Sequence, residues 1–487
     1  MRNYMSEIIA LAGWSPEVLA YAYAKYSRSA LSIRQSIKDI SDDKAGKFLD
    51  TNYFNYGHRS IADNAHVSLA FEGISELAAY ELEDQSLWDG QEKSTRYQDF
   101  TGADAFFVPS SLAGSQTLNE SYVVVASFLM KQYVRYSAKC FDWLIKNNPK
   151  PQDKSQEAYE RAMKARAFDV ARYWLFNGIR TSVGQITNAR TLEDQISRLM
   201  SSEYQELRDL GESMKQACSS KPFCPDGRDE PPVAPTLVKY TAPNAYLISL
   251  RKKMHSKVEK FMFSFGPSRK RFVDLSDTES FSICALDVEI VASLLYEVSN
   301  YSYFDILEQV WLSSENQRRE IIDIALEDRD KHDPLPRAFA AGHAIQFDIS
   351  IDRGAQRDLH RHRNCIQISQ PLSTERGWDV PAMIGEVGME DDFNEGMLWV
   401  KKRIDDLRVH IGVDSDYLIP FAFRSGVLYK MNLAQAVYMS ELRSGTGGHF
   451  SYRDVANQMH NRLSDHLPFL EDHARVTPFE NQDLLKR

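Results

Sequence analysis

The feature that most constrains the fold of this chain is a pair of patterns that each occur twice, in the same order. Residues 66–71 and 345–351 alternate apolar and polar side chains, as half-buried strands do, and a helical pattern follows each of them. Further along, residues 186–190 and 430–434 each precede another long helical pattern. Similar segments that keep both their order and a spacing of roughly a hundred residues indicate an internal duplication.

Length and composition fit two similar domains. A chain of 487 residues exceeds one ordinary core, because single domains usually have about 100–200 residues. A stretch rich in Pro, Gly and polar side chains lies between long helical patterns, and we place a linker there, at residues 221–244. The prediction is therefore an N-terminal domain at 1–220 and a C-terminal domain at 245–487.

Composition excludes several classes of protein. Hydrophobic residues make up 43% of the chain and charged residues 26%, as in soluble globular proteins. No stretch approaches the roughly 18–20 apolar residues of a membrane helix, and the N-terminus lacks a signal pattern, so we expect a cytoplasmic protein without membrane contact. The net charge of −10 argues against a nucleic-acid-binding surface. The five cysteines have no metal-ligand spacing, and we expect no metal site.

A basic cluster follows the second strand pattern of this acidic chain. It contains Arg353, Arg357, Arg361 and Arg363, against Asp358 alone. If the segment is helical, the first three arginines share one face, because residues four apart lie on the same side of a helix. Guanidinium groups match phosphate oxygens, so a bound phosphate or diphosphate is one explanation of this crowding. The alternative is a helix face whose arginines pair with acidic residues elsewhere.

The end of this cluster resembles a known motif. Arg361-His362-Arg363, followed by Ser373 and Arg376, is similar to the signature of flavin-dependent thymidylate synthases, in which a seven-residue spacer separates an Arg-His-Arg triplet from Ser and Arg. The match departs from the family at Pro371, which stands eight residues after Arg363. The loop that faces the nucleotide in the family is therefore altered in this half.

The N-terminal half carries the complementary part of the motif. Gly57-His58-Arg59-Ser60 resembles the Gly-His-x-Ser segment of the family, and Glu92-Lys93-Ser94-Thr95-Arg96 closely matches its nucleotide-contacting loop. Asp84-Gln85-Ser86 stands where Arg-His-Arg is expected, so this half lacks the triplet. Further on, Arg190 resembles the family's nucleotide-binding arginine, whereas Ala434 stands at that position in the C-terminal half.

The resemblance implies a fold and an activity. The fold is α/β (α+β), with two tandem thymidylate-synthase-complementing-like domains, each a small sheet packed with long helices. The activity is reductive methylation of dUMP at C5, with FAD as cofactor and NADPH and methylenetetrahydrofolate as co-substrates. The residues assigned to the flavin are His58, Ser60, Arg361, His362 and Arg363. Those assigned to the nucleotide are Glu92, Ser94, Thr95, Arg96, Arg190 and Arg453, and those assigned to catalysis are Arg361, Ser94 and Arg96.

The N-terminal half lacks the Arg-His-Arg triplet and the C-terminal half has an altered loop, and this difference predicts how the two halves cooperate. Members of the family are homotetramers whose sites combine residues from different subunits, so a duplicated chain implies a homodimer. One kind of site pairs residues 361–363 with residues 92–96, and the opposite kind pairs residues 84–86 with the altered loop and is inactive. Two alternatives stay open: an inactive flavin- and nucleotide-binding paralogue that serves as a regulator or scaffold, and a flavoenzyme that modifies a pyrimidine differently.

Overall fold

The chain forms two compact units, each assembled from several segments. The computed structural model describes residues 9, 11, 13–27, 33–36, 41–51, 59–102, 104–262, 266, 268–275, 286–330, 333–481 and 483–485. The first unit comprises residues 1–71, 87–91 and 183–244, and the second comprises 72–86, 92–182 and 245–487. The division into 1–220, 221–244 and 245–487 concerns the duplication rather than these compact units, and it stays a prediction.

The first unit is mainly helical. Side chains of Ser15, Ser41 and Asn188 accept backbone N–H groups at the first turns of three of its helices, which satisfies donors that have no partner within the helix. Residues 221–244 contain no helix or strand, as their composition predicts. The helices of this unit are α1 (Pro16–Tyr26), α2 (Ile33–Ser36), α3 (Asp42–Leu49), η2 (Arg59–Asn64), α7 (Ala189–Met200) and α8 (Gln205–Ser219).

The long helical pattern that begins at residue 189 is two helices rather than one. The chain leaves the helix after Met200 and re-enters it at Gln205. The hydroxyl of Ser201 donates to the carbonyl of Ser197, and that of Ser202 accepts the N–H of Tyr204. Serine side chains that bond nearby backbone groups compete with helical hydrogen bonds, so the break falls at this pair of serines.

A first, three-stranded sheet has the strand order β1-β3-β2. Each of its strands carries the chain from one unit to the other: β1 (His66–Ser75), β2 (Asp89–Glu92) and β3 (Arg180–Asn188). The alternating pattern at residues 66–71 is therefore a strand, as predicted. Ser75 ends β1 and caps the helix α4 (Glu76–Glu83), which follows without a loop.

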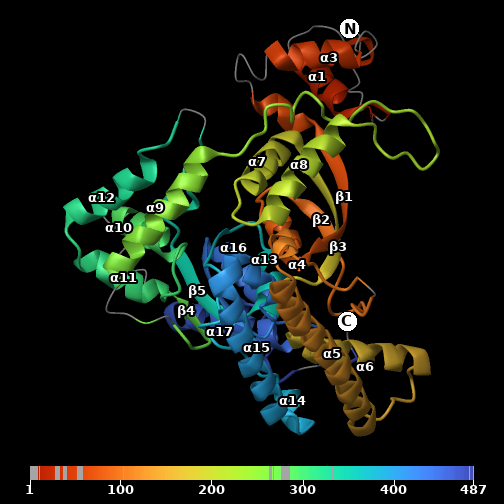
Figure 1. The fold of residues 1–487 in the computed structure, drawn as a ribbon, viewed down its shortest axis with the longest axis vertical. Coiled ribbons are helices and arrows are strands. Elements are labelled where there is room, and N and C mark those ends of the chain that lie inside the picture. Colours follow the sequence, from red (N-terminus) through yellow and green to blue (C-terminus); the bar gives the residue numbers. More distant parts are fainter. Residues whose placement is uncertain are drawn as a thin grey trace. The chain divides into compact units, whose positions relative to one another are not determined.

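A second sheet lies within the second unit and has the order β4-β5-β7-β6, with all neighbours antiparallel. Leu428 and Ile368 lie in one apolar cluster together with helices α9–α12, which gather in green in Figure 1. Val427 and Tyr429 lie in another, with α13, α16 and α17. The sheet is thus covered on both faces, which explains why every residue of β5 is buried. Its strands are β4 (Phe272–Leu275), β5 (Ile345–Asp352), β6 (Ile366–Ser369) and β7 (Arg424–Met431).

The remaining helices of the second unit include α5, the longest helix among the described residues, which packs against α6 (Figure 1). Two small sheets packed with long helices confirm the α/β (α+β) class. Among the described residues, no helix combines the length and apolar composition needed to cross a membrane. The helices are α4, η3 (Ser110–Gly114), α5 (Gln116–Asn147), α6 (Gln156–Ala171), η4 (Arg172–Trp174), α9 (Ala245–Phe261), α10 (Leu286–Tyr296), α11 (Tyr303–Leu312), α12 (Glu315–Leu326), η7 (Arg337–Phe339), α13 (Arg353–His360), α14 (Ala382–Glu386), α15 (Glu390–Ile411), η8 (Gly412–Leu418), α16 (Leu433–Arg443), α17 (Phe450–His466) and α18 (Phe469–His473).

The two halves of the chain meet in the second unit through a local two-fold junction. The N–H of Asn177 donates to the carbonyl of Ile419 (3.1 Å), and the N–H of Phe421 donates to the carbonyl of Leu175 (2.7 Å). Asn177 and Phe421 lie 244 positions apart in the sequence, and so do Leu175 and Ile419. Exchanging the two halves therefore leaves this pair of hydrogen bonds unchanged, as expected where two copies of one segment meet.

The same correspondence aligns helices α4 and α13. The N–H of Glu76, the first residue of α4, donates to the carbonyl of Ile179 (2.9 Å). The N–H of Arg353, the first residue of α13, donates to the carbonyl of Phe423 (2.9 Å). Both helices have eight residues, so the residues after them, Asp84 and Arg361, occupy corresponding positions. This agrees with the sequence comparison, in which Asp84-Gln85-Ser86 stands where Arg-His-Arg is expected.

Candidate functional site

The candidate site lies within the second unit, around the loop that follows β2. The N–H of Lys93 donates to the carbonyl of Ser182 (3.0 Å), and the carbonyl of Ser94 accepts the N–H of Gln98 (3.0 Å). The hydroxyl of Ser94 accepts the N–H of Arg96 (3.3 Å). These local contacts fix the loop, so its side chains have defined partners on helices from both halves of the chain.

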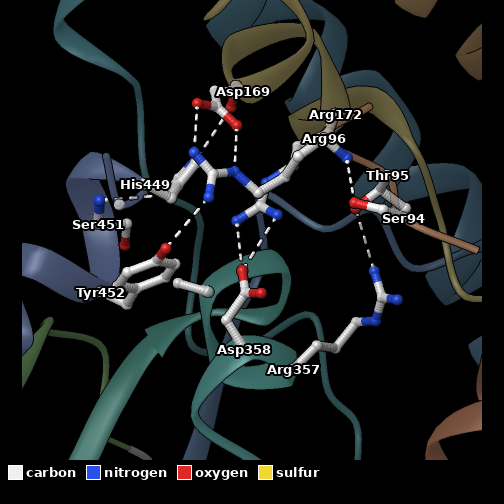
Figure 2. A network of polar contacts seen from close by, with 12 residues as sticks. Ser94, Thr95, Arg96, Asp169, Arg172, Arg357, Asp358, His449, Ser451 and Tyr452 are labelled. Carbon is white, nitrogen blue, oxygen red and sulfur yellow. Dashed lines mark hydrogen bonds and ion pairs between the residues drawn. The ribbon is translucent and has the colours of Figure 1, made fainter. Parts of the chain in front are cut away.

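Arg96 is at the centre of the network in Figure 2. Its Nε and Nη2 donate to the two carboxylate oxygens of Asp169 at 2.6 and 2.9 Å, and its Nη1 donates to the hydroxyl of Tyr452 at 3.1 Å. Burial alone would raise the pKa of Asp169, but the Arg96 guanidinium outweighs burial and holds the pKa of that carboxyl well below its usual range. A two-point charged contact of this kind fixes Arg96 before a ligand binds.

Arg357, on α13, joins the loop to α4. Its Nη2 donates to Glu92 at 2.7 Å, its Nη1 reaches the hydroxyl of Thr95 at 3.4 Å, and its Nε contacts the carboxylate of Glu76. Burial, reinforced by the charge of Glu92, raises the pKa of Glu76 well above its usual value, although Arg357 opposes this. The predicted arginine stripe is thus part of a helix, and Arg357 follows the alternative interpretation, because its partners are acidic side chains.

Asp358, the next residue of α13, pairs with Arg172 at the end of α6. One carboxylate oxygen, Oδ2, accepts from both Nη1 and Nη2 of Arg172 at 3.2 Å. Burial would raise the pKa of Asp358, but Arg172, and after it Arg96 and Arg443, lower it to about 2. Asp358 is therefore ionised at neutral pH, among several guanidinium groups.

His449 positions the start of α17 against the network. Its Nδ1 accepts the N–H of Ser451 at 3.2 Å, which leaves Nε2 as the nitrogen that donates to the backbone carbonyl of Asp169 at 2.9 Å. Burial, reinforced by the charge of Arg172, lowers the pKa of His449 well below its usual value, so the ring is neutral. This contact ties α6 to α17 and places the hydroxyl of Tyr452 beside Arg96.

The Arg-His-Arg triplet follows α13 directly. Arg361 is exposed, whereas His362 is buried. The Nε of Arg443 donates to Nε2 of His362 at 2.7 Å, and the side-chain amide of Gln435 lies 3.4 Å from its Nδ1. Burial, reinforced by the charge of Arg443, lowers the pKa of His362 to about 3. His362 is therefore a neutral acceptor that orients Arg443.

The structure brings some of the predicted site residues together. Seven of them belong to the second unit and lie in the network or in the turn after α13: Glu92, Ser94, Thr95, Arg96, Arg361, His362 and Arg363. Arg453 is also in this unit, but its side chain is fully buried and donates to the carbonyls of Ser444, Pro478 and Asn481 at 2.9, 3.1 and 3.2 Å. It anchors the C-terminal segment, and its contact with a nucleotide stays a prediction.

Three further predicted residues lie elsewhere. Ser60 is exposed in η2 of the first unit, and Arg190, also in that unit, pairs with Asp63 at 2.9 Å. His58 lies outside the described residues. Their roles in a flavin or nucleotide site stay predictions.

Several members of the network were not predicted as site residues from the sequence, among them Asp169, Arg172, Arg443 and Tyr452. Asp169 and Arg172 belong to an ordinary helical pattern that carries no motif. Arg443 and Tyr452 lie between Ala434 and Arg453, two positions that were compared with the family, and this was the one available signal. Buried charges need partners, so the partners of Arg96 and Arg357 had to exist, but the sequence does not identify them.

The position that corresponds to this site in the other half is occupied by internal contacts. Asp84, where Arg-His-Arg is expected, accepts from Arg337 at 2.8 Å. Arg376, in the altered loop, is 1% exposed and donates to the carbonyl of Asn300 at 3.1 Å and to the side chain of Gln370. The cations here have protein partners, as Arg96 and Arg357 do, and the inactivity of this position stays a prediction.

A carboxyl group beside the site makes the stability of the protein depend on pH. Burial, reinforced by the charge of Glu92, raises the pKa of Glu83 from 4.5 to about 7. The folded protein therefore keeps a proton that the unfolded chain releases, and stability falls as the pH rises from 4.5 to about 7. Glu83→Gln removes a cost of up to about 3 kcal/mol above that range, so we expect the variant to be the more stable protein at pH 8.

Urea unfolding near pH 5 and near pH 8 measures this effect. The gap in unfolding free energy between Glu83→Gln and the parent should widen at the higher pH. Glu81→Gln, on the same helix but partly exposed, is the matched control and should show no such widening. Equal gaps at both pH values for Glu83→Gln would show that this carboxyl titrates normally.

Comparison with known proteins identifies the family. The family model described as thymidylate synthase complementing protein matches residues 10–224 and 293–469. A UPF0159 protein of Chlamydia muridarum is 24% identical over 99% of this chain and 94% of its own length. A UPF0159 protein of Thermoplasma acidophilum is 24% identical over 86% of each chain.

Two shorter matches involve named flavin-dependent thymidylate synthases. The one from Clostridium tetani is 23% identical over 47% of this chain and 84% of its own length. The solved structure of ThyX from Helicobacter pylori, complexed with FAD and dUMP, covers 42% of this chain and 89% of that chain, with 16% identity and a TM-score of 0.28. Because the family model matches most of this chain, in two successive segments, the chain belongs to the thymidylate synthase complementing protein family.

Proposed function

We propose that this protein is a flavin-dependent thymidylate synthase-like enzyme that methylates dUMP reductively at C5, using FAD, NADPH and methylenetetrahydrofolate. The observation that carries the proposal is a network in which the loop of one half-motif contacts α13, the helix that leads directly into the Arg-His-Arg triplet of the other. The loop at Glu92–Arg96 from one half contacts α13 and α17 from the other half. The family of the chain, and a relative named for this activity, support the choice of reaction.

The side chains at this junction fit anionic ligands. Arg361 is exposed in the turn after α13. In the described part of the chain, Nη1 and Nη2 of Arg443 have no hydrogen-bond partner, and His362 holds its Nε. Guanidinium groups of this kind match the oxygens of a nucleotide phosphate or of a flavin diphosphate. The donor set therefore suits both ligands.

Each side chain has a role in this proposal. Arg96 holds the nucleotide phosphate, with Asp169 fixing its orientation, and Ser94 lies beside the nucleotide. Arg361 and Arg363 hold the flavin diphosphate, and neutral His362 orients Arg443. The guanidinium groups stabilise the negative charge that develops on the pyrimidine ring. When bound, the flavin supplies the redox chemistry, and the protein supplies orientation and charge.

The asymmetry between the halves predicts one nucleotide site per chain. Asp84 stands where the triplet would begin, and Arg376 is 1% exposed and bonded to backbone carbonyls, so this position offers fewer guanidinium groups to a phosphate than the one with Arg96 and Arg361. Calorimetric titration with dUMP should give a stoichiometry near one per chain. A stoichiometry near two would show that both positions bind and that the halves do not complement each other.

Two measurements test the proposed activity. Absorbance of the purified protein in the flavin bands shows whether FAD is present, and tritium release from C5-labelled dUMP, with methylenetetrahydrofolate and NADPH, shows turnover. Binding of both ligands without tritium release would identify an inactive paralogue. We further propose a homodimer in the cytoplasm, which light scattering and fractionation test.

A further inference from the structure

Asp169, the carboxylate that fixes Arg96, is shared with a second arginine, Arg166 of α6. Its two oxygens accept from Arg96, as Figure 2 shows, and Oδ2 also accepts from Nη1 of Arg166 at 3.3 Å. The side chains of Arg166 and Asp169 are each 4% exposed. A buried charge needs its partner in a defined place, so the orientation of Arg96 depends on where Arg166 lies.

The C-terminal segment, residues 477–481 and 483–485, has no helix or strand among its described residues. Its carbonyls accept hydrogen bonds from buried side chains instead. Arg453 donates to two of them, and Nδ2 of Asn457 donates to the carbonyl of Thr477 at 3.2 Å. The segment lies outside the residues that the family model matches, so the resemblance to the family gives it no role.

Arg166 joins this segment to the network around Arg96. Its Nη2 donates to the carbonyl of Asp483 at 2.8 Å, and its Nε donates to the carbonyl of Leu484 at 3.2 Å. A guanidinium is a rigid plane, so these two contacts fix the direction of its third nitrogen. That nitrogen, Nη1, donates to Asp169 and to the carbonyl of Gly448, at 3.3 Å each. Displacement of the segment would therefore turn Nη1 away from its partners.

We propose that Arg166 is a positioning residue through which the C-terminal segment sets the orientation of Arg96. For its effect on binding the inference rests on the proposed nucleotide site, whereas the contacts that carry it lie within the second unit and need no ligand. Binding at Arg96 and ordering of the segment are then coupled, and such coupling is reciprocal. The segment strengthens nucleotide binding, and a bound nucleotide stabilises the segment.

Hydrogen exchange on the full-length protein measures this coupling without any ligand. Arg166→Lys keeps the buried charge, but a single nitrogen cannot take the places of Nε, Nη1 and Nη2 together. Exchange in peptides that span residues 477–485 should rise about tenfold or more in this variant, because charged hydrogen bonds to the segment are lost. Exchange at residues 93–98, in the loop that carries Arg96, should rise with it.

A double-mutant cycle on dUMP affinity separates positioning from general stability. Arg166→Lys should weaken dUMP binding about three- to thirtyfold in the otherwise unchanged protein, as measured by calorimetry. In the Arg96→Ala background the same change should alter the affinity by less than about twofold, because the side chain that Arg166 positions is then absent. A merely structural role of Arg166 would lower the affinity equally in both backgrounds.

Arg161→Lys, at an exposed position of the same helix, is the matched control. It should change neither the exchange rates nor the affinity for dUMP. In the parent, dUMP should also slow exchange at residues 477–485, and this measurement needs no variant to fold.

The possible results separate this inference from the proposed function. If the parent does not bind dUMP, the proposed function fails, and exchange in Arg166→Lys still decides whether the C-terminal segment is coupled to the loop. If the parent binds dUMP but exchange in the variant rises at residues 477–485 alone, Arg166 holds the segment without positioning Arg96, which overturns the inference. Equal losses of affinity in both backgrounds of the cycle overturn it as well.

Discussion

Arg96→Ala should weaken dUMP binding by about 2–5 kcal/mol and leave FAD bound. The structure gives the reason for a loss of this size. The guanidinium is held by both oxygens of Asp169 and by the hydroxyl of Tyr452, so it is placed for a phosphate without further ordering. Calorimetry with dUMP and flavin absorbance measure the two ligands separately on the same variant.

Two other arginines serve as controls for Arg96→Ala. Arg135 pairs with Asp392 on the surface, with side chains 44% and 46% exposed, and Arg135→Ala should change dUMP affinity by less than about 0.5 kcal/mol. Arg376 is 1% exposed, so Arg376→Ala should lower the melting temperature more than it lowers affinity. A result in which Arg376 controls dUMP affinity and Arg96 does not would assign the working site to the other loop.

Replacing both Arg361 and Arg363 with Ala should abolish the uptake of FAD. Each charged hydrogen bond contributes about 1.5–3 kcal/mol, so the double change should weaken binding by about 3–6 kcal/mol. Arg361 is exposed, and His362 keeps its contact with Arg443, so the fold should survive. Titration with FAD, followed by flavin fluorescence, measures the loss, and circular dichroism checks the fold.

A double variant elsewhere controls for the change in charge. Arg228→Ala with Arg319→Ala removes the same two charges at side chains that are 67% and 74% exposed. FAD affinity should stay within a factor of about two, because exposed ion pairs contribute little and salt screens distant charges. If the double variant of Arg361 and Arg363 takes up FAD as well as the parent does, this pair belongs to the solvated surface.

Much of the fold could be predicted because it depends on local patterns. The alternation at residues 66–71 and 345–351 gives β1 and β5, and the helical patterns that follow them give α4 and α13. The break between α7 and α8 could not be predicted, since the helical pattern continues across it. Two serine hydroxyls that bond the nearby backbone end the first helix instead.

The site could be predicted only where a motif marks it. The loop at Glu92–Arg96 and the triplet at Arg361–Arg363 were assigned to the candidate site in this way, and their roles stay predictions. The partners of Arg96 were not, because Asp169 is 73 positions away and Tyr452 is 356 positions away. Ion pairs over such distances depend on how the two halves pack, and one sequence does not contain that information. For Arg357, pairing with acidic residues elsewhere in the chain was one of the two interpretations. The sequence did not show that Glu76 and Glu92, among its many carboxylates, would be the partners.

The local two-fold junction holds together two halves that are covalently linked. Its two backbone segments, around Asn177 and Phe421, belong to one covalent chain. Dilution therefore does not dissociate them, as it dissociates separate subunits. In the proposed division of labour, each half can therefore lack a function that its neighbour retains, and neither half is active alone. Splitting the gene between residues 221 and 244 would yield two fragments whose association is bimolecular. Their assembly would then depend on the concentration of the fragments, whereas assembly of the intact chain does not.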